Sequence, residues 1–128
     1  MSVLLDTHVL LWFQLLDKRL SASLRNRIER SPEAHYVSQV SFWEIAIKAS
    51  LGKLRLSQDL AATFKDIRDA GFLVLPFREE HFLEVAMLPF HHRDPFDRML
   101  IAQARNEGME LLTADLHFAA YDVALVKA

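Results

Sequence analysis

The sequence contains no cysteine, only three glycines and four prolines, and no excess of positive charge. Without cysteine the chain has no disulfide bond, no thiolate metal ligand and no cysteine nucleophile. No apolar run approaches the ~20 residues that cross a bilayer. The N-terminal stretch MSVLLDTHVLLWFQLL is interrupted by Asp6 and His8 and lacks a basic start and a cleavage site. We therefore read it as mature structure, not a signal peptide, and expect a cytoplasmic protein with no membrane partner.

Charge and length limit the function classes further. Fifteen Lys and Arg stand against seventeen Asp and Glu, for a net charge of −2, which excludes nucleic-acid binding by charge alone. If divalent metal neutralised four acids, 17 − 4 = 13 would remain against 15 basic residues. The chain has 128 residues, 52% of them hydrophobic, and no repeats or linker-like stretches. We expect one globular domain over residues 1–128.

Short apolar runs alternate with longer segments of helical period. Ser21, Ser57 and Asp94 with Pro95 are typical helix starts, and Gly71 and Gly108 are placed to end two of these helices. This alternation predicts a parallel sheet with helices on both faces, whose ligands bind beyond the carboxyl ends of the strands. The five runs expected to form strands are Val3–Leu5, Tyr36–Val37, Leu73–Leu75, Leu111–Leu112 and Val123–Val126.

Two aspartates follow predicted strands directly. Asp6 comes after the first run, in VLLDTHV, and Asp115 comes after the fourth, in ELLTADLHF. Each could simply cap the helix that follows, because aspartate is a strong N-cap residue. Both also lie at the edge of the sheet where ligands bind, so each is a candidate site residue.

The stretch HHRDPFDRML holds two further aspartates at the start of a helix. Asp94 and Pro95 suffice to begin that helix. Asp97 lies three and four residues before Leu100 and Ile101, so it heads the apolar face of the helix. A carboxylate placed there costs several kcal/mol unless it is paired or metal-bound. Asp97 is therefore the acid that capping does not explain.

Glu44 stands in an apolar helical segment, SFWEIAIK. It could form an exposed pair with Lys48, four residues on. The alternative is that Glu44 converges with the other acids on one or two divalent cations. Oxygen ligands favour Mg²⁺ or Mn²⁺ over zinc or copper. The predicted metal site would then contain Asp6, Glu44, Asp97 and Asp115.

The histidines give no comparable pattern. His91 and His92 precede the helix, where loop histidines usually face solvent, and no other histidine is spaced to complete a metal site with them. We assign no role to any of the six histidines.

Four motifs together resemble a PIN-domain ribonuclease, and most closely the VapC-type toxins of bacterial toxin–antitoxin pairs. They are LLDTHVLLW, SQVSFWEIAIK, DPFDRMLIAQA and LLTAD, and they cover essentially the whole chain in order. The resemblance implies a three-layer α/β/α fold with a parallel sheet of about five strands. It also implies metal-dependent cleavage of RNA, a cognate antitoxin as partner, and a homodimer.

The resemblance also implies roles for particular residues. The family's acidic positions fall on Asp6, Glu44, Asp97 and Asp115, and metal held there would activate a water that attacks the RNA phosphate. Polar support falls on Thr7 and Thr113, and Asp94 matches an acid of variable role. Three basic residues could contact RNA phosphates or serve only in surface pairs: Lys48, Arg93 and Arg98.

Two other functions remain open at this stage. A non-catalytic PIN-like scaffold would use the same acids to bind basic groups of a partner. A phosphorelay receiver domain has a similar size and fold class, but it needs an acceptor aspartate after the third strand. The segment LVLPF at 73–77 offers none. Trp12, Phe13, Phe42 and Trp43 fit either the core or, by the resemblance, a dimer or antitoxin surface.

Overall fold

The computed structural model describes residues 2–127. Its strands are β1 (Val3–Leu5), β2 (His35–Ser38), β3 (Leu73–Leu75), β4 (Glu110–Thr113) and β5 (Leu125–Lys127). Its helices are α1 (Thr7–Gln14), α2 (Ala22–Arg30), α3 (Gln39–Ser50), α4 (Leu60–Asp69), α5 (Glu79–Met87), α6 (Pro95–Glu107) and the 3₁₀ helix η1 (Leu116–Ala120).

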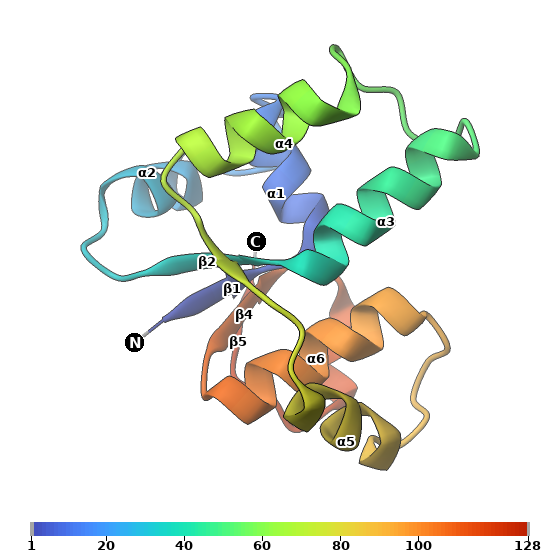
Figure 1. The fold of residues 1–128 in the computed structure, drawn as a ribbon. Helices are drawn as coiled ribbons and strands as arrows, with labels where there is room; N and C mark the ends of the chain where they lie inside the picture. Colours follow the sequence, from blue (N-terminus) through green and yellow to red (C-terminus); the bar gives the residue numbers. More distant parts are fainter. Residues whose placement is uncertain (1, 128) are drawn as a thin grey trace.

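The five strands form one sheet in the order β3-β2-β1-β4-β5, and every pairing is parallel. The first strand is therefore central and lies beside β4, although more than a hundred residues separate them: Val3 pairs with Glu110 and Leu5 with Leu112. Figure 1 shows α1, α2 and α4 on one face of the sheet and α5 and α6 on the other. The three-layer α/β/α arrangement and the five parallel strands are as predicted.

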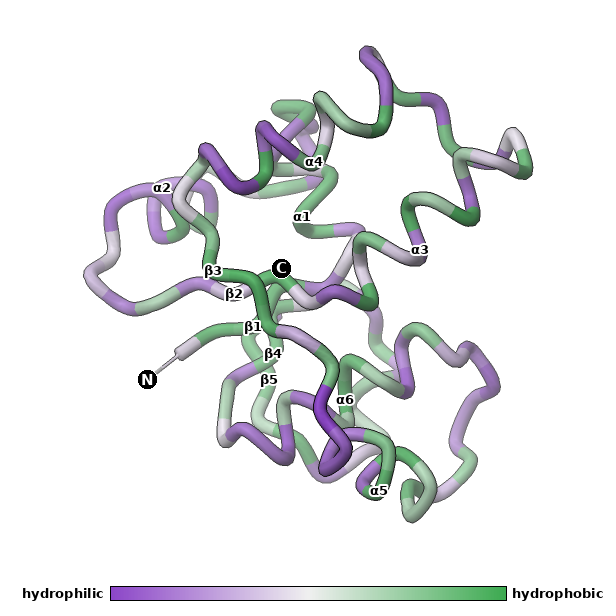
Figure 2. The backbone as a smooth tube through the Cα atoms, viewed as in Figure 1, coloured by the Kyte–Doolittle hydropathy of each residue, from purple (hydrophilic) through white to green (hydrophobic). Residues whose placement is uncertain are grey.

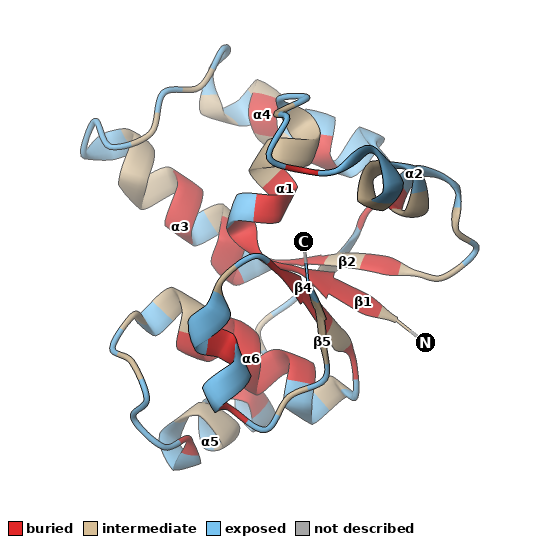
Figure 3. Cartoon of the chain, turned by 180° about the vertical axis from the view of Figure 1, so that it is seen from behind, coloured by how far each residue is buried: buried red, intermediate tan, exposed pale blue. Residues whose placement is uncertain are grey.

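Successive side chains of a strand point to opposite faces of the sheet, so each face has its own hydrophobic core. In β1, Val3 and Leu5 pack in the cluster beneath α1, α2 and α4, whereas Leu4 packs in the cluster beneath α6. Hydrophobic residues run along the strands in Figure 2, and the inner side of α6 is buried in Figure 3. Because both faces are covered, these short strands are almost uniformly apolar.

The helix boundaries follow local chemistry. Ser21 accepts a hydrogen bond from the Leu24 N–H and caps α2 as predicted, and Gly108 ends α6 with a φ of +67°, which a residue with a side chain adopts only at a cost. The predicted cap Ser57 is wrong. Asp59 caps α4 by accepting from the Ala62 N–H, so the helix starts two residues later.

Strand positions were predicted to within two residues, with one shift at the end of the chain. The last strand is Leu125–Lys127, so Val123 lies outside it and packs against the α6 core instead. No helix within residues 2–127 is long and apolar enough to cross a membrane.

Candidate active site

The site lies at the carboxyl edge of the sheet, where β1 and β4 end side by side. The Asp6 N–H donates to the Leu112 carbonyl over 2.9 Å, so ladder pairing holds the start of the site in place. Asp6 and Asp115 follow these two neighbouring strands. They lie at the carboxyl edge of the sheet, which the alternation of strands and helices in the sequence predicted.

Asp6 occupies the N-cap position of α1 but makes no side-chain capping bond, so capping does not explain it. Its side chain is 2% exposed. Oδ2 accepts a hydrogen bond of 2.8 Å from the Thr113 hydroxyl, whereas the buried Oδ1 has no hydrogen-bond partner among residues 2–127. Burial raises the pKa of Asp6 above its ordinary value, and the nearby charge of Glu44 adds to this effect.

Glu44 does pair with Lys48, but it is not a surface residue. Its Oε2 accepts from the Lys48 ammonium, while the residue is 2% exposed and Oε1 finds no partner in the described chain. Burial alone would lower the pKa of Lys48, but the Glu44 bond and the charges of Asp94 and Asp97 raise it. The exposed-pair interpretation is therefore wrong about exposure, and Lys48 stays a cation beside the acids.

As predicted from the sequence, Asp94 caps α6, and Asp97 is not needed as a cap. Oδ1 of Asp94 accepts from the backbone N–H groups of Phe96 and Asp97 over 2.9 and 3.0 Å, which fixes the first turn of α6. Burial, with the charges of Asp94, Asp6 and Glu44, raises the pKa of Asp97 to about 8. A carboxyl group so perturbed needs either a proton or a cation.

Asp115 is the most exposed of the four acids, and it both caps a helix and lies in the site. Its Oδ1 accepts from the His117 N–H over 2.8 Å and caps η1. The same oxygen lies 3.0 Å from Nδ1 of His117. Its charge contributes to the raised pKa of Asp97, so the two carboxylates are neighbours.

His92 is the site residue that the sequence did not reveal. Ligand atoms of His92, Asp97 and Asp115 lie within 4.8 Å of one another, and Nε2 of His92 is 3.7 Å from Oδ2 of Asp97. The expectation that this loop histidine faces solvent is wrong. Periodicity gives no information on the path of the loop before α6, so nothing in the sequence pattern placed His92 beside Asp97.

Arg98 and Thr7 differ from expectation, whereas Arg93 does not. Arg98 is only 6% exposed and pairs with no acid of the site: its guanidinium donates to the carbonyls of Pro89, Leu88 and Val85. Its guanidinium is thus engaged by the backbone and forms no surface ion pair within residues 2–127. The Thr7 hydroxyl shares a 2.8 Å hydrogen bond with Ser41 and does not contact a site carboxylate. Arg93 is exposed.

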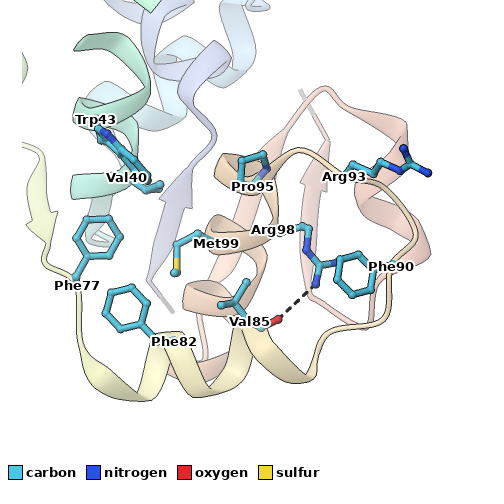
Figure 4. Close-up of a pocket in the computed structure, with 10 residues that line it drawn as sticks. All are labelled: Val40, Trp43, Phe77, Phe82, Val85, Phe90, Arg93, Pro95, Arg98 and Met99. Atoms are coloured by element: carbon cyan, nitrogen blue, oxygen red, sulfur yellow. Dashed lines mark hydrogen bonds between the residues drawn. The ribbon is translucent and has the colours of Figure 1, made fainter. Parts of the chain in front are cut away.

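An apolar cavity of about 680 Å³ lies beside α6 (Figure 4). Its walls come from α3, the segment between β3 and α5, α5 itself, the loop between α5 and α6, and the start of α6. Trp43, predicted as core or surface, is 53% exposed here, whereas Trp12, Phe13 and Phe42 pack against the core beneath α1, α2 and α4. The lining includes Val40, Trp43, Phe77, Phe82, Phe90 and Met99.

Comparisons with known proteins agree with this architecture. The sequence matches the PIN domain family over residues 3–124. It is 28% identical over 114 residues to Ribonuclease VapC22 of Mycobacterium tuberculosis, covering 89% of this chain and 87% of that protein.

Solved structures share the fold. VapBC2 from Rickettsia felis, bound to a promoter DNA fragment, has a TM-score of 0.75 at 14% identity, over 100% of this chain and 99% of that one. VapBC-1 from nontypeable Haemophilus influenzae has a TM-score of 0.71 at 17% identity, over 99% and 98%. The family match spans nearly all the described residues and does not fit a receiver domain. The chain belongs to the PIN-domain family.

Proposed function

We propose that this protein is a Mg²⁺- or Mn²⁺-dependent endoribonuclease, the toxin of a toxin–antitoxin pair, acting on RNA in the cytoplasm as a single domain. Family membership, the similarity to Ribonuclease VapC22 and the acidic site at the sheet edge support this function.

The observation that carries the proposal is a pair of buried carboxylate oxygens without partners, Oδ1 of Asp6 and Oε1 of Glu44. A buried polar atom left unpaired costs about 1–3 kcal/mol, and more when it is charged. Asp97 and Asp115 add further negative charge nearby. A divalent cation would satisfy these oxygens and remove the mutual repulsion, so the residues present fit such an ion.

Asp6, Asp97 and Asp115 would hold the cation, with Glu44 available to it or to a second one. A divalent cation at such a site lowers the pKa of a bound water and stabilises negative charge on a phosphate. Thr113 orients Asp6 through its hydrogen bond, and Asp94 fixes the helical turn that carries Asp97.

Basic residues near the acids would attract the RNA backbone. Lys48 lies at the site through its contact with Glu44, and Arg93 is exposed on the loop that precedes α6. We propose both as phosphate contacts, because a point charge is sufficient for that role. Arg98 is not included, since its guanidinium is occupied by backbone carbonyls.

We also propose two protein partners. Similarity to the VapBC complexes supports a cognate antitoxin. A second copy of this chain would cover the apolar cavity beside α6, where Trp43, Phe82 and Phe90 are half or more exposed. Contiguous exposed apolar surface of this kind marks an interaction face, and a twofold dimer buries the same face of both copies.

The function is tested with purified antitoxin-free protein and a labelled single-stranded RNA. We expect cleavage with Mg²⁺ or Mn²⁺, none with excess chelator, and recovery when metal is restored. Asp97→Asn should lose cleavage, whereas Asp69→Asn should retain it, because Asp69 is exposed on α4 and pairs only with Lys65. Cleavage that survives chelation, or that survives in Asp97→Asn, contradicts the proposal. Metal binding without any cleavage would instead favour the non-catalytic scaffold.

A further inference from the structure

The hydroxyl of Tyr121 contacts both the backbone of the loop before α6 and the imidazole ring of His92, a residue of that loop. It lies 3.2 Å from the backbone N–H of His91, 3.1 Å from that of His92 and 3.2 Å from Nη1 of Arg98. It also lies 3.2 Å from Nδ1 of the His92 ring. Four polar groups therefore surround one phenol oxygen.

The direction of these hydrogen bonds follows from the chemistry of the donors. Backbone N–H groups and a guanidinium can only donate. Three donors already crowd the Tyr121 oxygen, so its own hydrogen must go to an acceptor. Nδ1 of His92 is the only acceptor within hydrogen-bond distance of that oxygen among residues 2–127.

This arrangement determines the tautomer of His92. If Nδ1 accepts the Tyr121 hydrogen, the N–H of the ring is on Nε2. Nε2 is buried and has no hydrogen-bond partner within the described residues, and its nearest acid, Asp97, is 3.7 Å away. The ring is held edge-on against Phe118 at 5.9 Å between centroids, so its orientation is fixed.

We propose that His92 presents the N–H donor at Nε2 to a phosphate oxygen of bound RNA, with Tyr121 and Arg98 as the residues that position it. This inference rests on the proposed nuclease function. An anionic oxygen suits a buried donor that lacks an acceptor, because a hydrogen bond to a charged group is stronger than one between neutral groups. A site lined by carboxylates also needs attractive contacts for phosphate.

The tautomer of His92 decides whether the ring donates a hydrogen bond to RNA or binds the metal. A histidine that binds a metal does so through a lone pair. In the inferred tautomer the only lone pair is on Nδ1 and is occupied by Tyr121, so His92 is not a ligand for the cation. The substrate for the kinetic measurements is a short single-stranded RNA.

The first experiment measures the tautomer directly, by ¹⁵N NMR of the imidazole nitrogens in the free, full-length protein. We expect Nε2 of His92 to be protonated and Nδ1 to be unprotonated. In Tyr121→Phe this preference should weaken, with exchange between the two tautomers. A proton on Nδ1 in the wild-type protein overturns the inference whether or not the protein cleaves RNA.

The second experiment compares His92→Leu with His92→Gln, since the glutamine amide can place an N–H near the position of Nε2. We expect His92→Leu to lower kcat/KM for the RNA about tenfold to hundredfold, and His92→Gln to recover most of it. Mn²⁺ affinity, measured by calorimetry, should be unchanged in both variants.

Three results would overturn the inference about His92 while leaving the nuclease function intact. The first is an unchanged kcat/KM in His92→Leu, and the second is an equal loss of kcat/KM in His92→Gln with the fold intact. The third is weakened Mn²⁺ binding in His92→Leu. The last result would make His92 a metal ligand. A wild-type protein that neither binds nor cleaves RNA in any divalent metal overturns the nuclease function, and the RNA contact with it.

Discussion

The hydroxyl of Thr113 donates a 2.8 Å hydrogen bond to Oδ2 of Asp6, joining two residues that are 107 positions apart. The bond engages one carboxylate oxygen of Asp6 and leaves the other without a partner. A bond of this kind fixes the orientation of a metal-binding carboxylate before the metal arrives.

Thr113→Val should weaken metal binding. The bond to Thr113 lowers the pKa of Asp6, so its loss raises that pKa further and frees the carboxylate to rotate. We expect Mn²⁺ affinity to fall about tenfold. Calorimetric titration measures it, with Thr63→Val as the control, because the Thr63 hydroxyl bonds only to the Asp59 carbonyl. Equal affinities in the two variants would contradict the role of Thr113.

The metal-free protein should lose stability as pH rises. An aspartate titrates near 3.8 when unfolded, but the pKa of Asp97 in the folded protein is about 8. The folded state therefore holds this proton more tightly. Its contribution to stability is fully present below the unfolded pKa and is lost as pH rises through the folded pKa. The loss should be on the order of a few kcal/mol.

Denaturant unfolding at several pH values, in chelator, measures this effect. Asp97→Asn should flatten the decline, and Mg²⁺ should restore the stability of the wild-type protein at high pH. Asp6, whose pKa is also raised, adds a decline of the same sign in both proteins. Parallel curves for the wild type and Asp97→Asn would show that Asp97 titrates normally.

Arg98→Ala should destabilise the fold, unlike the substitution of a nucleotide contact. Its guanidinium satisfies the carbonyls of Pro89 and Leu88 and lies 4.0 Å from the Phe90 ring centre. We expect a loss of about 2–4 kcal/mol in the free energy of unfolding. The exposed neighbour provides the control: Arg93→Ala should change stability by less than about 0.5 kcal/mol but weaken RNA binding. The reverse pattern would return Arg98 to the RNA surface.

Phe82→Ser should convert the proposed dimer to a monomer. Phe82 lines the apolar cavity and stacks on Phe77 at 5.6 Å between ring centres. Light scattering at several protein concentrations gives the mass, and Leu51→Ser is the control, since Leu51 is as exposed but does not line that cavity. A wild-type protein that is monomeric at high concentration would contradict the dimer.

Much of this fold is predictable because its signals are local. Helix starts such as Ser21 and Asp94 use the first few residues of their own helices, and the buried strands read as apolar runs. Ser57 failed because Asp59, two residues later, is an equally good cap, and local chemistry does not choose between them.

The site was predictable as far as it depends on strand ends and helical period. Asp6 and Asp115 follow strands, and Asp97 heads a buried face. Arg98 and His92 were not predictable, because their roles depend on how the loop before α6 packs against Tyr121. Single-domain organisation over residues 1–128 and the catalytic roles of the acids stay predictions.

Because β1 pairs with β4, the site forms only after both strands have been synthesised. Asp6 is synthesised 115 − 6 = 109 residues before Asp115, and the ladder between Leu5 and Leu112 brings them together. A partly synthesised or truncated chain that lacks β4 has neither Thr113 to orient Asp6 nor Asp115 beside it. For a protein that cuts RNA, the site is therefore not assembled until β4 has been synthesised.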